Sequence, residues 1–224
     1  MVSIIVPVFN EEKNIENLIK ALQSLEGNKE IIVVDGSSTD NTFEAASKLT
    51  YTVKSKKSRA SQMNLGAKVS SGEILWFVHG DSHLEADSIK YIEEAIEEGY
   101  AGGGFSVYFY DYNTSFMKYI EHTSNIRSGK YGLFYGDQGI FVNRRVFFEL
   151  GGFPDMELME DFKFSNLIRR KGKMKLLKQR IGTSARRYKN GGQLRTHLFM
   201  HKIRLLYFLG VSPKKLSRMY GESR

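Results

Sequence analysis

The sequence predicts an α/β fold with a mostly parallel β-sheet and helices on both of its faces. Short apolar runs rich in β-branched residues alternate with helical patterns through residues 2–98, which is typical of parallel strands joined by helices. The 224 residues allow one large core, and 41% hydrophobic with 12% aromatic residues is typical of a globular chain. The chain has no cysteine, which excludes disulfides and thiolate metal sites.

Strands and helices alternate regularly in the first half of the chain. The predicted strands are Val2–Phe9, Glu30–Asp35, Tyr51–Lys54 and Glu73–Val78. Apolar residues at helical spacing predict helices over residues 15–22, 42–49, 60–69 and 89–96. Asn10 and Asp87 are expected to cap the first and the last of these helices.

The pattern changes after residue 101. Phe105–Tyr110 is predicted as an alternating strand at an antiparallel edge of the sheet. A mixed stretch to Tyr135 predicts no clear element. The remaining predicted elements are a strand at Gly139–Asn143, helices at Arg144–Leu150 and Asp161–Arg170, an amphipathic helix at Leu194–Leu209 and a further helical turn from Ser212. We therefore expect a main domain over residues 1–192 and a basic helical appendage over residues 193–224.

Charge is divided unevenly along the chain. The formal net charge is +8, and residues 163–224 hold 18 of the 33 Lys and Arg residues but only one of the 25 acidic residues, Glu222. A solvated basic surface is one interpretation. The other is a surface that faces a diphosphate, an anionic lipid or a nucleic acid. Neither a signal-peptide pattern nor an apolar run near the ~20 residues of a membrane span is seen, so a cytoplasmic location is expected.

Polar residues stand near the carboxyl ends of predicted strands, where open α/β sheets bind ligands. Asp35 could accept both hydroxyls of a ribose or the N–H of a base, or it could satisfy backbone amides of its own turn. Arg59 precedes a helix, and a guanidinium at that position suits a diphosphate. Asp81 and His83 form an Asp-x-His sequence, which suits a divalent cation, Mn²⁺ better than Mg²⁺.

Four ordered motifs carry a resemblance to a known family. They are Ile4–Glu11, Val33–Asp40, His79–His83 and Leu158–Phe162. Their order and wording resemble the family-2 glycosyltransferases, which carry the Rossmann-like GT-A fold, and the resemblance covers residues 2–190. The chain is most similar to a small stand-alone bacterial group of that family associated with radical-SAM and selenium-domain genes. The resemblance implies an inverting, hexosyltransferase-type transfer from a nucleotide-diphospho-sugar to an unidentified acceptor hydroxyl.

The resemblance also assigns residues to the donor side of such a site. Pro7, Phe9 and Glu11 would line the nucleotide pocket, with Phe9 as a stacking surface. Asp35 would contact the nucleotide, and Arg59 would lie at the diphosphate.

On the acceptor side, the Glu160-Asp161 pair would carry the catalytic base, matched here by Asp161. A purely structural acidic start of a helix is the alternative. Asp137 and Gln138 resemble part of the acceptor-side loop. Arg186 and Arg187 fall where a mobile basic segment could neutralise the leaving diphosphate, so they would act on the donor.

The family's usual metal motif is Asp-x-Asp, so His83 is a departure from it. With Asp81 as one ligand and His83 as the second, the expected cofactor is Mn²⁺ or Mg²⁺. A third ligand from the C-terminal region is common in GT-A folds, and His197 or His201 could serve, because the two are spaced for one helix face. A solvated helix face is the alternative for these two histidines.

Two other functions were compared with sugar transfer. A sugar-nucleotide nucleotidyltransferase would need a Gly-rich loop with a Lys after the first strand, and residues 7–11 read Pro-Val-Phe-Asn-Glu instead. A non-catalytic module could bind an anionic surface or nucleic acid through the basic tail. No nucleic-acid motif appears, so a nucleic-acid partner is not expected.

The predicted C-terminal helix places Leu194, Leu198, Leu205 and Phe208 near one face, with basic residues on other faces. Such a helix could lie at the inner face of a membrane and suit a lipid-linked acceptor. It could instead pack on the domain or on a second subunit of a homodimer.

Overall fold

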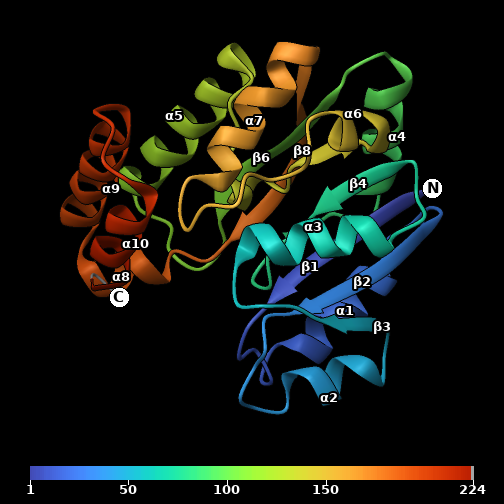
Figure 1. Cartoon of the computed structure of the whole chain (residues 1–224). Coiled ribbons are helices and arrows are strands. Elements are labelled where there is room, and N and C mark those ends of the chain that lie inside the picture. The colour runs from blue at the N-terminus through green and yellow to red at the C-terminus, as the bar shows by residue number, and fades with distance from the viewer. Residues whose placement is uncertain (223–224) are drawn as a thin grey trace.

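One curled, eight-stranded sheet with helices on both faces forms the centre of the molecule (Figure 1). The computed structural model describes residues 1–222. The strands are β1 (Val2–Val8), β2 (Lys29–Asp35), β3 (Tyr51–Lys54), β4 (Ile74–Phe77), β5 (His83–Leu84), β6 (Gly102–Phe109), β7 (Phe141–Asn143) and β8 (Met174–Thr183). Their order across the sheet is β3-β2-β1-β4-β7-β6-β8-β5.

The first four strands pair in parallel, and β6 pairs in parallel with β8. Strand β7 runs antiparallel to both β4 and β6, and β5 runs antiparallel to β8. The predicted fold class, a mostly parallel sheet with a small antiparallel part, is therefore confirmed. The predicted edge position of Phe105–Tyr110 is wrong, because β8 pairs with the side of β6 that β7 leaves open.

Helices and one short 3₁₀ turn fill the connections. They are α1 (Ile15–Gln23), α2 (Thr42–Ser47), α3 (Arg59–Val69), α4 (Ser88–Glu97), α5 (Ser115–Tyr131), η1 (Gly136–Gln138), α6 (Arg144–Glu149), α7 (Glu160–Lys171), α8 (Arg186–Gly191), α9 (Gln193–Phe208) and α10 (Pro213–Glu222). No helix among residues 1–222 is long and apolar enough to cross a membrane.

The alternation of side chains along β1 explains how two helical layers cover one sheet. Val2, Ile4 and Val6 pack in one cluster with apolar residues of α1 and α4, whereas Ile5 packs in a second cluster with residues of α3, α6 and α7. Successive residues of a strand point to opposite faces. Because β1 is apolar at every one of these positions, it can only lie buried between both layers.

Asn10 does not cap a helix, contrary to the prediction. Helix α1 begins at Ile15, and Asn10 takes a left-handed conformation with φ 54°. Its side-chain oxygen accepts a hydrogen bond from the backbone N–H of Thr39 at 2.9 Å. Asn10 thus joins the loop after β1 to the loop after β2. Asp87 does precede α4, but it makes no side-chain capping hydrogen bond.

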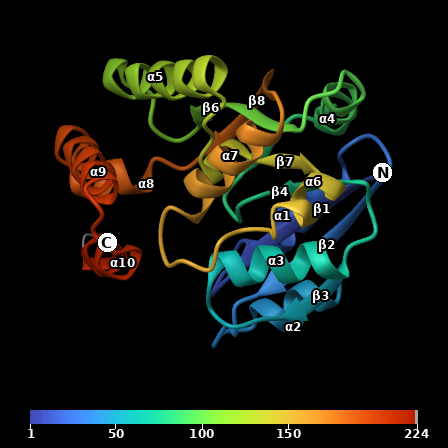
Figure 2. The same cartoon turned by 45° about the horizontal axis from the view of Figure 1, so that its top comes forward.

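Helices α8, α9 and α10 form a group beside the sheet (Figure 2). Gly192, with φ 79°, separates α8 from α9. The predicted domain boundary at residues 192 and 193 thus coincides with a break between helices, although a separate domain stays a prediction. Residues 223–224 of the predicted appendage lie outside the described residues.

Candidate active site

A cleft of about 840 Å³ opens at the carboxyl ends of β1 and β4. Strands β2 and β3 lie on one side of β1 in the sheet, and the chain then returns so that β4 lies on the other side of β1. Open α/β sheets bind ligands at such a reversal of strand order. The loop after β1 and the loop after β4 form two walls of the cleft, and the starts of α3 and α7 contribute to its lining.

The end of β1 and the loop after it bring Pro7, Phe9 and Glu11 to the cleft, and their contact with a nucleotide stays a prediction. The Asn14 side chain donates a hydrogen bond to the Glu11 carboxylate at 3.0 Å, which holds the Glu11 side chain in place. The Lys57 ammonium lies 3.5 Å from the centre of the Phe9 ring. One face of Phe9 therefore already carries a cation–π contact.

Asp35 is fully buried at the end of β2 and is not among the residues that line the cleft. Its carboxylate accepts a hydrogen bond from the backbone N–H of Ser38 at 2.9 Å and another from the Ser38 hydroxyl. These contacts match the turn-stabilising alternative that its sequence context allowed. The structure does not bring Asp35 to the cleft wall.

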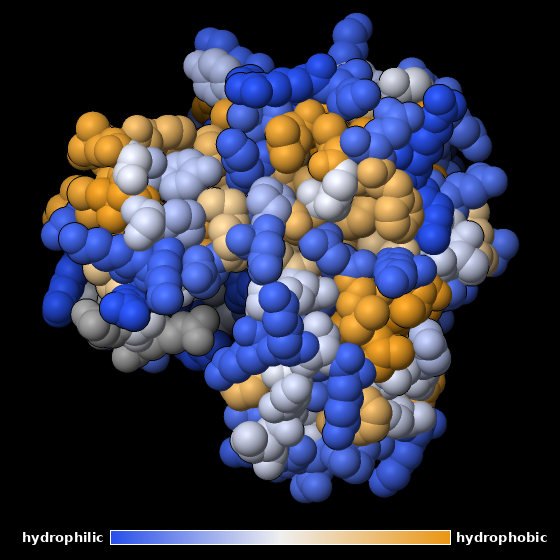
Figure 3. Space-filling model, in the orientation of Figure 1, coloured by the Kyte–Doolittle hydropathy of each residue, from blue (hydrophilic) through white to orange (hydrophobic). Residues whose placement is uncertain are grey.

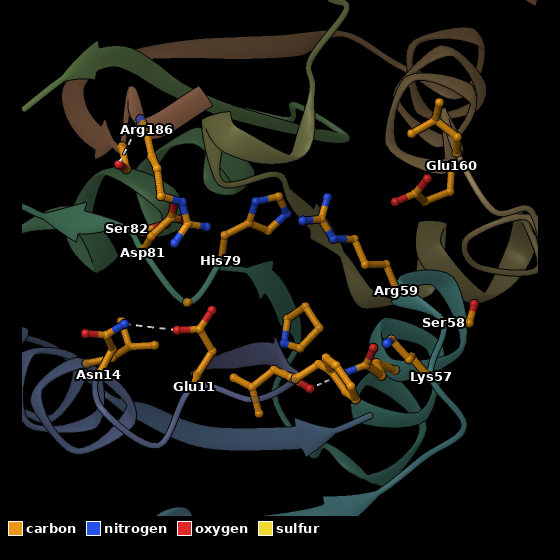
Figure 4. A pocket seen from close by; sticks show the side chains of 18 of the residues that line it. Glu11, Asn14, Lys57, Ser58, Arg59, His79, Asp81, Ser82, Glu160 and Arg186 are labelled. Carbon is orange, nitrogen blue, oxygen red and sulfur yellow. Dashed lines mark hydrogen bonds between the residues drawn. The ribbon is translucent and has the colours of Figure 1, made fainter. Parts of the chain in front are cut away.

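Arg59 is the first residue of α3, after the capping residue Ser58, whose hydroxyl accepts from Ser61 N–H at 3.4 Å. Figure 4 shows the Arg59 guanidinium between the His79 ring and the Glu160 carboxylate, pointing into the cleft. Because the helix N-terminus adds partial positive charge at the same place, this corner is suited to an anion.

The loop after β4 supplies Asp81, His83 and the unassigned His79 to the cleft. Desolvation and then the nearby Arg59 charge lower the pKa of His79 to about 3, so this imidazole is neutral near pH 7. The His83 ring stacks on Tyr110 with 3.8 Å between ring centres. Its orientation is thus fixed by packing rather than by a carboxylate.

The donor atoms in the cleft suit a metal whose coordination is completed by a substrate. No group of three or more His, Cys, Asp or Glu side chains that could hold a metal occurs within residues 1–222. The cleft does collect Asp81, His83 and Glu11 on its walls. Mg²⁺ in phosphate-transfer sites is bound by one or two carboxylates together with substrate phosphates, and the residues present fit that pattern.

His197 does not line the cleft, so the structure does not bring it to Asp81. It lies on α9 with its Nε2 atom 3.0 Å from Nε2 of His201. Its ring packs edge-on against Phe116 of α5 at 5.5 Å between centres. The structure therefore gives no support to His197 as a third metal ligand, and that role stays a prediction.

Glu160 and Asp161 occupy the first turn of α7, and only Glu160 is among the cleft-lining residues. Burial, followed by the neighbouring Asp161 charge, raises the pKa of Glu160. Burial also raises the pKa of Asp161, opposed by hydrogen bonds from the backbone. The preceding residue, Met159, has a left-handed φ of 70°. Backbone strain of this kind occurs most often at functional sites of proteins.

Gly136 joins two of the four motifs, those of His79 and Asp161. Its backbone N–H donates to Oδ2 of Asp161 at 2.7 Å. A Cβ atom at Gly136 would lie 2.6 Å from Nε2 of His79 and 3.4 Å from that same carboxylate oxygen. Only glycine fits here without displacement. The loop after β4, the 3₁₀ turn η1 and the start of α7 therefore meet at Asp161.

Asp137 lies beside this junction, and its Oδ1 is buried without a hydrogen-bond partner in the described part of the chain. Burial raises the pKa of Asp137 to about 6, while the Arg127 charge opposes the rise. The second acceptor-side residue, Gln138, is different. Its amide is buried and bonded to Arg127, Ser128 and the Phe105 carbonyl. Those bonds occupy its side chain and Gln138 does not line the cleft, so its place on the acceptor side stays a prediction.

Of the two predicted arginines on α8, only Arg186 lines the cleft. The Arg187 guanidinium lies 3.8 Å from the centre of the Tyr220 ring, and Tyr220 with Ser217 of α10 forms part of the cleft wall. The contribution of α10 to the cleft was not predicted. No local sequence pattern indicates that residues 7–11 and a helix some 200 residues later line the same cleft.

Comparisons with known proteins identify the family and the fold of the chain. A model of the family described as Glycosyl transferase family 2 matches residues 3–152. A dolichol-phosphate mannosyltransferase of Pyrococcus furiosus is 37% identical over 109 residues, which are 44% of this chain and 30% of that protein. Glycosyltransferase AglE of Haloferax volcanii is 28% identical over 177 residues, 69% of this chain and 56% of that protein. The chain thus covers less than two thirds of either relative.

Solved structures share the fold. The mannosyltransferase PcManGT from Pyrobaculum calidifontis, in complex with GDP-Man and Mn²⁺, matches with a TM-score of 0.67 at 19% identity, over 99% of this chain and 68% of that one. S. aureus TarS 1-349 in complex with UDP-GlcNAc matches with a TM-score of 0.62 at 19% identity, over 82% and 58%. The narrower radical-SAM-associated group stays a prediction. Since the family model covers about two thirds of the 224 residues, the chain belongs to glycosyl transferase family 2.

Proposed function

We propose that this protein transfers a sugar, of the hexose type, from a nucleoside-diphospho-sugar to an acceptor hydroxyl with inversion at the anomeric carbon. One observation carries the proposal: a single cleft at the strand-order reversal is lined both by the cations Lys57, Arg59 and Arg186 and by the carboxylates Glu11, Asp81 and Glu160. The cations suit a diphosphate and the carboxylates suit proton removal.

The proposed donor class is also supported by the neighbours, which bind GDP-Man or UDP-GlcNAc. In this chain the nucleotide would lie along Pro7, Phe9 and Glu11, at the end of β1. The diphosphate would lie at Arg59, where the guanidinium and the start of α3 both favour negative charge. Arg186, from α8, would approach the same phosphates from the opposite wall.

Asp161 is the proposed base. Its carboxylate is held by the Gly136 N–H, beside Asp137 on one side and Glu160 on the cleft side. It removes the proton from the acceptor hydroxyl, whose oxygen forms a bond to the anomeric carbon. The bond from that carbon to the diphosphate breaks at the same time, and the diphosphate leaves with the electron pair. A raised pKa makes Asp161 a stronger base than an exposed aspartate.

Arg59 and Arg186 stabilise the leaving diphosphate, and such electrostatic stabilisation is usually a large part of catalysis. A divalent cation, Mn²⁺ or Mg²⁺, held by Asp81 with His83 and Glu11 nearby, would supply further neutralisation of the phosphates. Glu160 faces Arg59 in the cleft, so it would orient this guanidinium rather than accept the proton.

The test uses water as the acceptor. GDP-mannose and UDP-N-acetylglucosamine, both α-linked, are incubated with the protein and Mn²⁺, and the released sugar is followed by NMR before its anomers equilibrate. Inversion predicts that the β anomer appears first together with nucleoside diphosphate. First appearance of the α anomer would overturn the inverting mechanism. Absence of hydrolysis and of any donor-dependent rise in melting temperature would overturn sugar transfer itself.

A further inference from the structure

Large apolar side chains are exposed in a stripe along α9. The exposed fractions of Leu194, Leu198, Leu205 and Phe208 are 61%, 58%, 59% and 65%. With about 3.6 residues per helical turn, these positions lie on one face. The buried residues of α9, Thr196 and Ile203, lie on the opposite face. The helix therefore packs on the protein through one side and presents its leucine stripe directly to the outside.

Basic side chains border this stripe. Arg195 and Lys202 are exposed on α9 at the edge of the stripe, and Lys214 and Lys215 follow on α10. None of these four forms a salt bridge within residues 1–222. Figure 3 shows the apolar surface over α9 with hydrophilic surface below it, over α8 and α10. An exposed apolar band bordered by cations that form no salt bridge offers both apolar area and positive charge to an anionic bilayer interface.

The charges around the stripe discriminate between the partners that could cover it: the protein's own domain, a second copy of the chain, a nucleic acid or a bilayer. The protein's own domain leaves most of it uncovered, because each of the four side chains is more than half exposed, and the contact of the Phe208 ring with that of Phe162, at 5.5 Å between centres, touches one end of the stripe. A two-fold contact between copies would bring Arg195 and Lys202 of both copies together around the stripe, and like charges at an interface oppose association. A nucleic acid would match the cations and leave the leucines in water. An anionic bilayer matches both, since its headgroups meet the cations and its acyl boundary takes the leucines.

We propose that α9 binds an anionic lipid bilayer through the stripe Leu194, Leu198, Leu205 and Phe208. Helix α9 packs on α8 and α10, and these helices supply Arg186, Ser217 and Tyr220 to the cleft wall. Bilayer contact thus places this wall at the membrane surface. If the protein has the proposed function, bilayer binding has one further consequence. The acceptor hydroxyl belongs to a lipid-linked molecule, which reaches the cleft along the side formed by α8 and α10.

The test is flotation of the full chain with vesicles of phosphatidylcholine alone and of phosphatidylcholine with phosphatidylglycerol. Wild-type protein is compared with Leu198→Glu/Leu205→Glu and with Tyr51→Glu. Tyr51 is a matched control, since it is 57% exposed but lies on the edge strand β3. Circular dichroism and the melting temperature check folding. The donor-dependent rise in melting temperature is measured on each preparation, because the donor cleft is independent of both substitutions.

Wild type and Tyr51→Glu should float with the anionic vesicles and less with the neutral ones, and high salt should reduce flotation. The double substitution should lower partition at least about tenfold. No flotation of the wild type, or equal flotation of the double variant, overturns the inference. So does a concentration-dependent dimer that the double substitution disrupts while vesicles do not bind. A donor response without flotation removes this inference alone, whereas flotation without a donor response removes only the proposed function.

Discussion

The two halves of the molecule place their charged groups differently. Residues 1–98 provide the parallel strands β1 to β4, and their charged side chains Arg59 and Asp81 are exposed on the cleft wall. Residues 102–222 provide buried carboxyls, and burial raises the pKa of Asp137, Glu160 and Asp161. Solvated charges suit the capture of an anionic ligand, whereas desolvated carboxyls suit proton transfer. The comparison teaches that donor binding and proton removal can be altered separately.

The largest expected effect is a loss of turnover on substitution of a buried carboxyl in residues 102–222. Asp161→Asn keeps the size of the side chain and removes its basicity, so the rate of nucleoside diphosphate release should fall by about 10²-fold or more. Donor affinity, measured by calorimetry, should stay within about twofold. Glu160→Gln is the matched control on the neighbouring position of α7. If Glu160→Gln shows the loss in turnover and Asp161→Asn does not, the base has been assigned to the wrong carboxyl.

A smaller effect is expected from the first half. Arg59→Ala should weaken donor binding by about tenfold or more, because a hydrogen bond to a charged group contributes about 1.5–3 kcal/mol. Arg59→Lys should recover part of the affinity, since an ammonium keeps the charge without the planar fork. Arg145→Ala is a control on α6, where the Arg145 side chain is 87% exposed. Equal donor affinity in Arg59→Ala and Arg145→Ala would contradict a diphosphate at Arg59.

The smallest effect concerns stability. The pKa of Asp137 is about 6 in the folded state, above the ordinary value of 3.8. Between pH 3.8 and about pH 6 the carboxyl of Asp137 keeps its proton in the folded protein but has released it in the unfolded chain. The free energy of unfolding therefore falls as the pH rises through this range, and the loss is complete above about pH 6. Asp137→Asn should therefore melt at least about 2 °C above the wild type at pH 8 and level with it below pH 4. Equal melting temperatures at pH 8 would show that this carboxyl is solvated.

The two halves also differ in how well the sequence predicted them. In residues 1–98, each strand is a short apolar run followed by a helical pattern, and the predicted strand ends agree with the structure to within about a residue. In the second half, β8 was missed because Lys175, Lys178 and Arg180 make it look like a solvated segment. Strand β8 forms through pairing with β6, about seventy residues earlier, which no local pattern reports.

The site shows the same division. Pro7 lies at the end of β1, and Phe9 and Glu11 follow it directly, so the fold alone brings them to the cleft. The positions of Gln138 and His197 depend on how α5 packs against η1 and α9, which no local pattern reports, and neither side chain lines the cleft. Asp35 shows that even a correctly placed strand end leaves the direction of a side chain undetermined, since hydrogen bonds to Ser38 turn it inward.

The central claim is that the cleft at the carboxyl ends of β1 and β4 is a donor site. Its most direct test is calorimetric titration of GDP-mannose and UDP-N-acetylglucosamine with and without Mn²⁺. Wild type and Asp81→Ala are compared, with melting temperatures as the check on folding. We predict that one donor binds with one equivalent, that Mn²⁺ tightens binding by about tenfold or more, and that Asp81→Ala loses only this Mn²⁺-dependent part. An unchanged Mn²⁺ effect in Asp81→Ala, or no donor binding by the wild type, would contradict the claim.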